Sequence, residues 1–219
     1  MRIIDLRAPR AIGVALLAFA CLAALPRGAA AQDADAFIQN LGSQAIQVMG
    51  PAIAPAQRIA RFRHLFETDF DLPGAARFVL GPKGRELAPA QHEEFLTVFR
   101  EFLAQAYSER LAQYAGEPFR VTGTRAQGDE TVVTSEVVRR SGNPVLIDWH
   151  VIDRDGRFLI TDVDVDRVSM KVTQRTEFAN IIQRNGGRAD ALLGALRQQL
   201  AQASAPQSGS SEPLPPRYR

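Results

Sequence analysis

The chain has 219 residues, of which 46% are hydrophobic, and its 26 basic and 24 acidic side chains give a formal net charge of +2. This length accommodates one domain with short appendages. A charge so close to balance offers no compositional support for a nucleic-acid partner.

The first 31 residues have the three regions of a secretory signal. Arginines stand in residues 1–10, an apolar run of about 15 residues follows over 11–25, and Ala29-Ala30-Ala31 fits a small-residue cleavage site. An uncleaved membrane anchor is the alternative, but a spanning helix needs about 20 apolar residues. We therefore predict a signal peptide over 1–31 and an exported mature chain that begins at Gln32.

Cleavage after Ala31 changes the chemistry that is available to the protein. It removes Cys21, the single cysteine, so the mature chain would contain neither a disulfide nor a reactive thiol. It also removes four arginines and one aspartate, which leaves 22 basic and 23 acidic residues and a net charge near −1.

Four helices are predicted ahead of any strand, beginning at Asp33 or Asp35, near Pro55, after Asp71 and at Pro89. Arg58, Arg61 and Arg63 fall away from the apolar face of the second helix. They form either a solvated surface or a patch for a partner or for lipid headgroups. The fourth helix, expected over 89–115, has a wide apolar stripe that favours a core or one wall of a ligand cavity.

Four antiparallel strands are predicted next, rich in Val and Thr or alternating between apolar and polar residues. The first two are expected over 119–124 and 130–140. The other two flank Asp155-Gly156, and alternation runs over 145–151 and 159–165. The predicted register places Val151 opposite Leu159, Trp149 opposite Thr161 and Ile147 opposite Val163.

Two helices and a tail complete the chain. Ser169 is the expected N-cap of a helix that Asn185-Gly186-Gly187 ends, and a last helix is expected over 191–203. Residues 204–219 are rich in Ser and Pro and are predicted to be disordered. We thus predict one α+β domain over 32–203, with a four-stranded, possibly five-stranded, antiparallel sheet packed against several helices.

No catalytic motif is present, and we predict that the protein is not an enzyme. His64, His92 and His150 stand in different elements without ligand spacing. The carboxylates at positions 162, 164 and 166 share one side of a strand and could hold a hard cation, or could form a solvent-facing edge. Neither the Gly nor the Glu of a calcium loop stands at the required position, so no metal site is predicted.

Several short motifs, taken in order, carry a family resemblance. These are Asp155-Gly156, Asp162-Val163-Asp164-Val165, Val168-Ser169, Arg175-Thr176-Glu177-Phe178, Ile181-Ile182-Gln183-Arg184-Asn185-Gly186 and, earlier, Asp71 to Gly81. Together they resemble the periplasmic phospholipid-binding proteins of the Mla lipid-transport pathway, also called the toluene-tolerance family. The chain departs from that family at Pro82-Lys83-Gly84, where an aromatic residue is common, and at Asp166-Arg167, where Glu-Gly is typical.

The resemblance implies a periplasmic carrier without a cofactor. Such a carrier takes a glycerophospholipid, tails inward, between sheet and helices. It then shuttles the lipid between an outer-membrane lipoprotein/porin complex and an inner-membrane ABC transporter with an MCE-domain component, which maintains outer-membrane lipid asymmetry. A hopanoid or another polycyclic lipid is the alternative cargo, and an exported enzyme using Asp148 or Asp162 as a base is the alternative function.

The apolar face of the predicted hairpin must meet the apolar faces of the helices, because no other surface of similar size can cover it. Side chains from both faces are therefore the predicted lining of an apolar, lipid-binding pocket. They are Phe99, Leu103, Tyr107, Ile147, Trp149, Val151, Leu159, Val163, Phe178 and Ile181.

Overall fold

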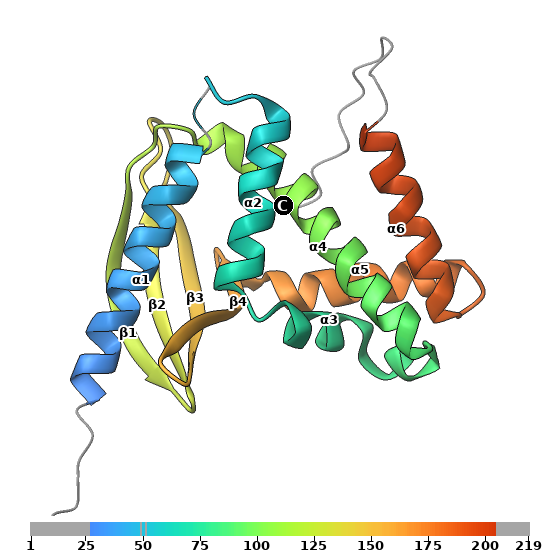
Figure 1. The fold of residues 1–219 in the computed structure, drawn as a ribbon. Helices are drawn as coiled ribbons and strands as arrows, with labels where there is room; N and C mark the ends of the chain where they lie inside the picture. The colour runs from blue at the N-terminus through green and yellow to red at the C-terminus, as the bar shows by residue number, and fades with distance from the viewer. Residues whose placement is uncertain (1–26, 49, 51, 205–219) are drawn as a thin grey trace, which may run out of the picture.

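The structure, a computed structural model, describes residues 27–48, 50 and 52–204 (Figure 1). Its helices are α1 (Arg27–Val48), α2 (Pro55–Asp69), α3 (Leu72–Leu80), α4 (Pro89–Leu111), α5 (Met170–Arg184) and α6 (Ala189–Ser204). Its strands are β1 (Phe119–Gln127), β2 (Glu130–Val137), β3 (Val145–Arg154), β4 (Arg157–Val165) and β5 (Val168–Ser169). Short 3₁₀ turns, Gly81–Glu86 and Ala112–Tyr114, follow α3 and α4.

The five strands form one antiparallel sheet in the order β1-β2-β3-β4-β5. The predicted α+β class and the antiparallel sheet are confirmed, including the possible fifth strand, which has only two residues. Helix α1 lies along β1 and β2, whereas α2, α3 and α5 contact β4. Figure 1 therefore shows two parts, the sheet with α1 and a group formed by α2 to α6.

One hydrophobic cluster joins these two parts. Its centre is a group of three aromatic rings, in which Phe95 and Phe99 of α4 stack at 5.6 Å and Phe178 of α5 meets both edge-on at 6.2 and 5.8 Å. Edge-on and offset ring pairs are favourable beyond the area that they bury. The apolar stripe predicted for the fourth helix is therefore a core face.

The predicted start of the first helix is wrong. Helix α1 begins at Arg27, because the alanines that follow are strong helix formers, so neither Asp33 nor Asp35 is an N-cap. The Asp35 carboxylate instead accepts a hydrogen bond from the Thr124 hydroxyl of β1. Gln39 likewise accepts from the backbone amide of Val121 at 3.1 Å, and both contacts attach α1 to the edge of the sheet.

The predicted appendages fall mostly beyond the described residues. Residues 1–26 of the signal and 205–219 of the tail lie outside them. The predicted cleavage site after Ala31 falls within α1, and Ser204, expected in the tail, is the last residue of α6.

The N-caps predicted at Ser169 and Asp71 are confirmed. The Ser169 hydroxyl accepts from the amide of Val172 at 3.0 Å, and the Asp71 carboxylate accepts from the amide of Gly74 at 3.1 Å. Gly81 ends α3 with a positive φ of 54°, a conformation that is costly for residues with a Cβ. Local side-chain chemistry thus sets these helix ends.

The predicted register of the β3–β4 hairpin is wrong, although its Asp155-Gly156 turn is confirmed. A β-bulge between His150 and Val151 leaves Thr161 as an extra residue in β4. The pairs are therefore Ile147 with Val165, Trp149 with Val163, Val151 with Ile160 and Ile152 with Leu159.

The Asp71 carboxylate connects α3 to the sheet, because it caps α3 and also accepts from the Arg154 guanidinium at 3.1 Å. We expect Asp71→Ala to lower the free energy of unfolding by about 1–2 kcal/mol, the cost of losing a helix cap. Asp71→Asn should lose less, since Asn caps helices as well as Asp does. Chemical denaturation measures the free energy of unfolding of both variants. Equal losses in Asp71→Ala and Asp71→Asn would show that the ion pair with Arg154, and not the helix cap, is responsible.

Candidate functional site

Eight of the ten predicted pocket residues lie in or against the hydrophobic cluster between sheet and helices. Four are buried members of it, and the other four are half-buried side chains packed against it. The buried members are Phe99, Leu103, Val151 and Phe178, and the half-buried ones are Tyr107, Trp149, Val163 and Ile181. The structure therefore brings these eight together, and their role in lining a pocket stays a prediction.

The other two predicted residues lie apart from that cluster. Ile147 is half-buried beside Val165, and Leu159 pairs with Ile152 on the opposite face of the sheet. The bulge causes this change, because Ile160 takes the inward position that alternation assigned to Leu159. Ile160 is 1% exposed and is the residue that the sequence pattern missed.

The inward face of the sheet keeps its few polar groups satisfied internally. The Trp149 indole donates to the Ser135 hydroxyl at 2.8 Å, and Ser135 is completely buried. Phe119 of β1 meets the Trp149 ring edge-on at 6.4 Å. Because these polar groups bond to each other, the face presents apolar surface to the helices.

The opposite face of the sheet carries a polar network around His150. Glu130 accepts from the Thr161 hydroxyl at 2.7 Å and lies 3.0 Å from Nδ1 of His150, whose Nε2 lies 3.5 Å from Asp164. Burial raises the pKa of Glu130, but the hydrogen bonds from Thr161 and His150 outweigh it and the net shift is downward.

Asp148 extends this network along the same face. It accepts from Thr134 at 2.6 Å and from Arg125 at 2.9 Å. Burial again raises the pKa, and the hydrogen bonds from Arg125 and Thr134 bring it below its usual value. Asp148 therefore lies on the face opposite the hydrophobic cluster, which is not where the alternative enzyme needs its base.

The three strand aspartates do not converge on one point. Asp162 accepts from the Ser169 hydroxyl and from the backbone amides of Val163 and Lys171, at the start of α5. Asp166 accepts from the Leu146 amide at 3.2 Å. Among the described residues no group of three or more His, Cys, Asp or Glu is placed to hold a metal ion.

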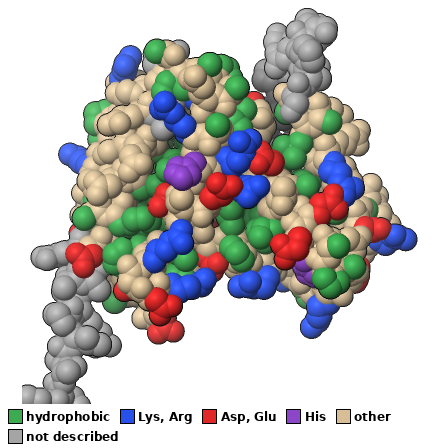
Figure 2. Space-filling view, viewed as in Figure 1, with side chains coloured by type: hydrophobic (Ala, Val, Ile, Leu, Met, Phe, Trp, Pro, Cys, Tyr) green, Lys and Arg blue, Asp and Glu red, His purple; other side chains and the backbone are tan. Residues whose placement is uncertain are grey.

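The three arginines predicted as a possible patch on the second helix have separate environments. Arg63 makes two hydrogen bonds to Glu101 of α4, at 2.6 and 2.7 Å, and Arg61 is exposed. On the face drawn in Figure 2, basic and acidic side chains are interspersed. On this face the arginines of α2 therefore stand among acidic side chains.

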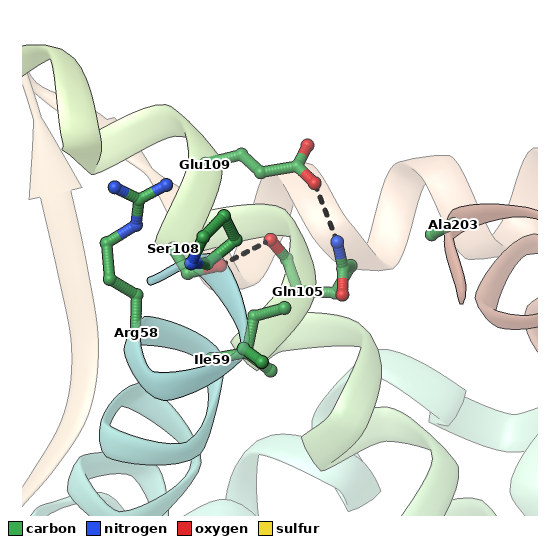
Figure 3. A pocket seen from close by; sticks show the side chains of 8 residues that line it. Arg58, Ile59, Gln105, Ser108, Glu109 and Ala203 are labelled. Carbon is green, nitrogen blue, oxygen red and sulfur yellow. Dashed lines mark hydrogen bonds between the residues drawn. The ribbon is translucent and has the colours of Figure 1, made fainter. Parts of the chain in front are cut away.

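Arg58 instead lines a hollow of about 370 Å³ at one end of the α2–α4 pair, which we call the α2–α4 hollow (Figure 3). Its lining residues are Pro55, Ala56, Arg58, Ile59, Gln105, Ser108, Glu109 and Ala203. The sequence suggested a possible headgroup contact for Arg58. Periodicity did not indicate that the other lining residues would come together.

Comparison with known proteins identifies the family. A sequence model of the MlaC protein family matches residues 39–198, which is most of the chain. The chain belongs to the MlaC family. This finding confirms the resemblance in the sequence motifs.

Two individual proteins are similar to this chain. Toluene tolerance protein Ttg2D of Pseudomonas putida is 24% identical over 144 residues, which cover 65% of this chain and 67% of that protein. A solved phospholipid-binding protein from Ralstonia solanacearum, in complex with a phospholipid, matches with a TM-score of 0.65 at 20% identity. That match covers 78% of this chain and 99% of the solved one, and it shows a shared fold.

The helices can be compared with the dimensions of a bilayer. In the described part of the MlaC-family chain, none has both the length and the apolar character that are needed to cross a membrane.

The polar network predicts how stability depends on pH. Glu130 and Asp148 have lower pKa values in the folded chain, so their stabilising contribution is present above the unfolded values, near 4.5 and 3.8, and is lost as pH falls below them. We expect the free energy of unfolding to fall between about pH 5 and pH 3. In the Glu130→Gln/Asp148→Asn double variant this fall should be smaller, as measured by denaturant titration at each pH. If the free energy of unfolding of this double variant falls with pH as steeply as that of the wild type, Glu130 and Asp148 are not the groups responsible. Glu93→Gln, at an exposed position, is the control and should keep the wild-type pH dependence.

Proposed function

We propose that this protein carries a glycerophospholipid, with its acyl chains inserted between the sheet and the helices. Membership of the MlaC family supports the proposal, as does a solved protein of the same fold that is described as phospholipid-binding. The observation that carries it in this chain is the apolar layer itself, which draws on both parts of the molecule. The positions of Asp148 and Asp162 outside this layer favour a carrier over an enzyme.

The acyl chains would take the place of side-chain contacts within the layer. The two parts of the molecule are connected by backbone near β4, where Phe70 bridges to Ile160 and the Asp71 amide donates to the Ile160 carbonyl at 2.9 Å. Elsewhere the layer consists of side chains such as Tyr107, Val163 and Ile181, which are half-buried rather than fully enclosed. We propose that the lipid inserts among these half-buried side chains.

The energy of tail burial determines how such a carrier must work. Each buried CH₂ contributes about 0.8 kcal/mol, so two chains of about 16 carbons correspond to about 25 kcal/mol against release into water. Spontaneous release is therefore too slow to be useful. We propose transfer by direct contact with a partner that accepts the lipid.

The proposed partners and location follow from the family. We place the mature protein in the periplasm, between an outer-membrane lipoprotein/porin complex and an inner-membrane ABC transporter with an MCE-domain component. In this role it would help to maintain the lipid asymmetry of the outer membrane.

Lipid extraction tests the proposed function. The mature chain, residues 32–219, is purified from a periplasmic extract without detergent, and its bound lipids are quantified by mass spectrometry. We expect about one diacyl glycerophospholipid per protein. A preparation without lipid would contradict the proposal, and a polycyclic lipid in its place would change the cargo.

Val163→Trp tests whether acyl chains reach the sheet. Val163 is half-buried in the apolar layer beside Trp149, so a larger side chain should fill space that a lipid occupies and lower the bound lipid severalfold. Val168→Trp, at a position that is 45% exposed on the neighbouring strand, is the matched control. If Val163 instead packs in a closed core, Val163→Trp should leave the lipid content unchanged and cost about 1–3 kcal/mol of stability.

Export predicts the N-terminus of the mature protein. Intact-mass analysis of protein from the periplasm should show a chain that begins at Gln32, either free or cyclised. Recovery of the full chain from Met1 in the inner membrane would contradict cleavage after Ala31.

A further inference from the structure

The α2–α4 hollow places opposite charges on its two sides. Arg58 extends from α2 on one side and Glu109 from α4 on the other, with Ser108 between them (Figure 3). Neither side chain takes part in any of the ion pairs within 4.0 Å among the described residues. The hollow therefore contains a cation and an anion that do not neutralise each other directly.

Arg58 has unused hydrogen-bonding capacity. Its Nη1 is 3.5 Å from the carbonyl oxygen of Ile53, which is a long contact, and its buried Nε has no partner. A buried donor without an acceptor is costly. A guanidinium matches the geometry of a phosphate and stays charged at all relevant pH values. Arg58 is thus suited to hold a phosphate oxygen.

Glu109 has acceptor capacity left on the other side. The Gln105 amide donates to one Glu109 oxygen at 2.6 Å, which holds the carboxylate in place. Among the described residues, no hydrogen bond reaches the other oxygen of this carboxylate. A primary ammonium group has three donors and would complete this carboxylate with charge-assisted hydrogen bonds.

The inner side of the hollow borders the hydrophobic cluster. Ile59 lines the hollow and packs against that cluster, and the next turn of the same helix contributes buried Phe62. Ser108 is 2% exposed, and its hydroxyl donates to the Gln105 carbonyl at 3.0 Å, so it does not compete for a ligand. A molecule with a polar head in the hollow and apolar chains in the cluster fits this arrangement.

We propose that the α2–α4 hollow is the headgroup site for a zwitterionic glycerophospholipid that has a primary ammonium group. The phosphodiester bonds to Arg58, and the ammonium bonds to Glu109. This inference rests on the proposed function and adds a headgroup preference to it. The volume of about 370 Å³ lies near the lower end of small-molecule pockets, about 300–1,000 Å³, which suits a headgroup.

Selectivity follows from Glu109. A phospholipid whose headgroup ends in glycerol has the same phosphate but no cation. Glu109 is exposed, so its carboxylate would then stay hydrated and add no charge-assisted hydrogen bond to the complex. The preference is the difference between the two affinities. Phosphatidylethanolamine should therefore be preferred over phosphatidylglycerol.

The test compares the lipids that co-purify with variants expressed in the same cells. When Arg58→Ala competes with wild-type protein for a limiting amount of phosphatidylethanolamine vesicles, it should take up about tenfold less lipid than wild type. Among the co-purified lipids, Glu109→Gln should retain the total but lower the ratio of phosphatidylethanolamine to phosphatidylglycerol about tenfold. These factors correspond to the loss of one hydrogen bond to a charged group. Exposed Arg61→Ala on α2 and Glu93→Gln on α4 are the matched controls and should keep the wild-type amount and ratio.

The outcomes separate this inference from the proposed function. Wild-type protein without phospholipid would contradict the proposed function itself. Wild-type protein with phospholipid, together with Arg58→Ala and Glu109→Gln indistinguishable from their controls at unchanged melting temperature, would overturn only the headgroup site.

A calorimetric titration of delipidated protein with inorganic phosphate distinguishes the two sources of a phosphate group. The headgroup site predicts no saturable binding at millimolar phosphate. Binding that disappears in Arg58→Ala would assign the hollow to free phosphate and overturn the lipid assignment.

Discussion

The hydrophobic layer between the sheet and the helices is the constraint on which the rest of the molecule depends. The sheet buries its inward face against α1 and the helices around α4 and α5. In the part of the chain that the structure describes, α4 exposes no large hydrophobic side chain and α5 exposes Val172 alone. One cluster therefore determines both the stability of the fold and the place where an apolar ligand can be held. A carrier built in this way must give up part of its own core packing when it is loaded.

The parts of the fold that were predictable from sequence are those set by short-range chemistry. Ser169 and Asp71 cap their helices through contacts three residues away, and Asp155-Gly156 turns the chain with two positive φ angles. The bulge at Thr161 was not predictable, because alternation continues through it and the extra residue becomes visible only once β3 and β4 are paired. The early start of α1 was missed for a different reason, since the alanines of the expected cleavage site also favour a helix.

The candidate site also contains residues that a local sequence pattern predicts and residues that only tertiary packing brings together. Eight of the ten predicted residues meet in the hydrophobic cluster because a strand face and a helix stripe are periodic in sequence, and their role in lining a pocket stays a prediction. Leu159 lies on the other face of the sheet because the period slips by one residue at the bulge. The residues that line the α2–α4 hollow do not recur at a regular spacing in the sequence. Arg58 and Glu109 are about fifty positions apart, and each reads as an ordinary polar residue on its own helix until tertiary packing places the helices together.

The edges of the sheet have a consequence for the proposed insertion of lipid into the apolar layer. An exposed strand edge can pair with another chain, and a core that loosens periodically increases this risk of aggregation. At one edge β5 pairs with only the last two residues of β4, and further along β4 the Phe70–Asp71 segment pairs with Ile160. At the other edge α1 lies against β1, and Gln39 takes the Val121 amide, one of the groups that an incoming strand would need. The fold can thus expose apolar surface to a lipid while offering little backbone to a second copy of itself.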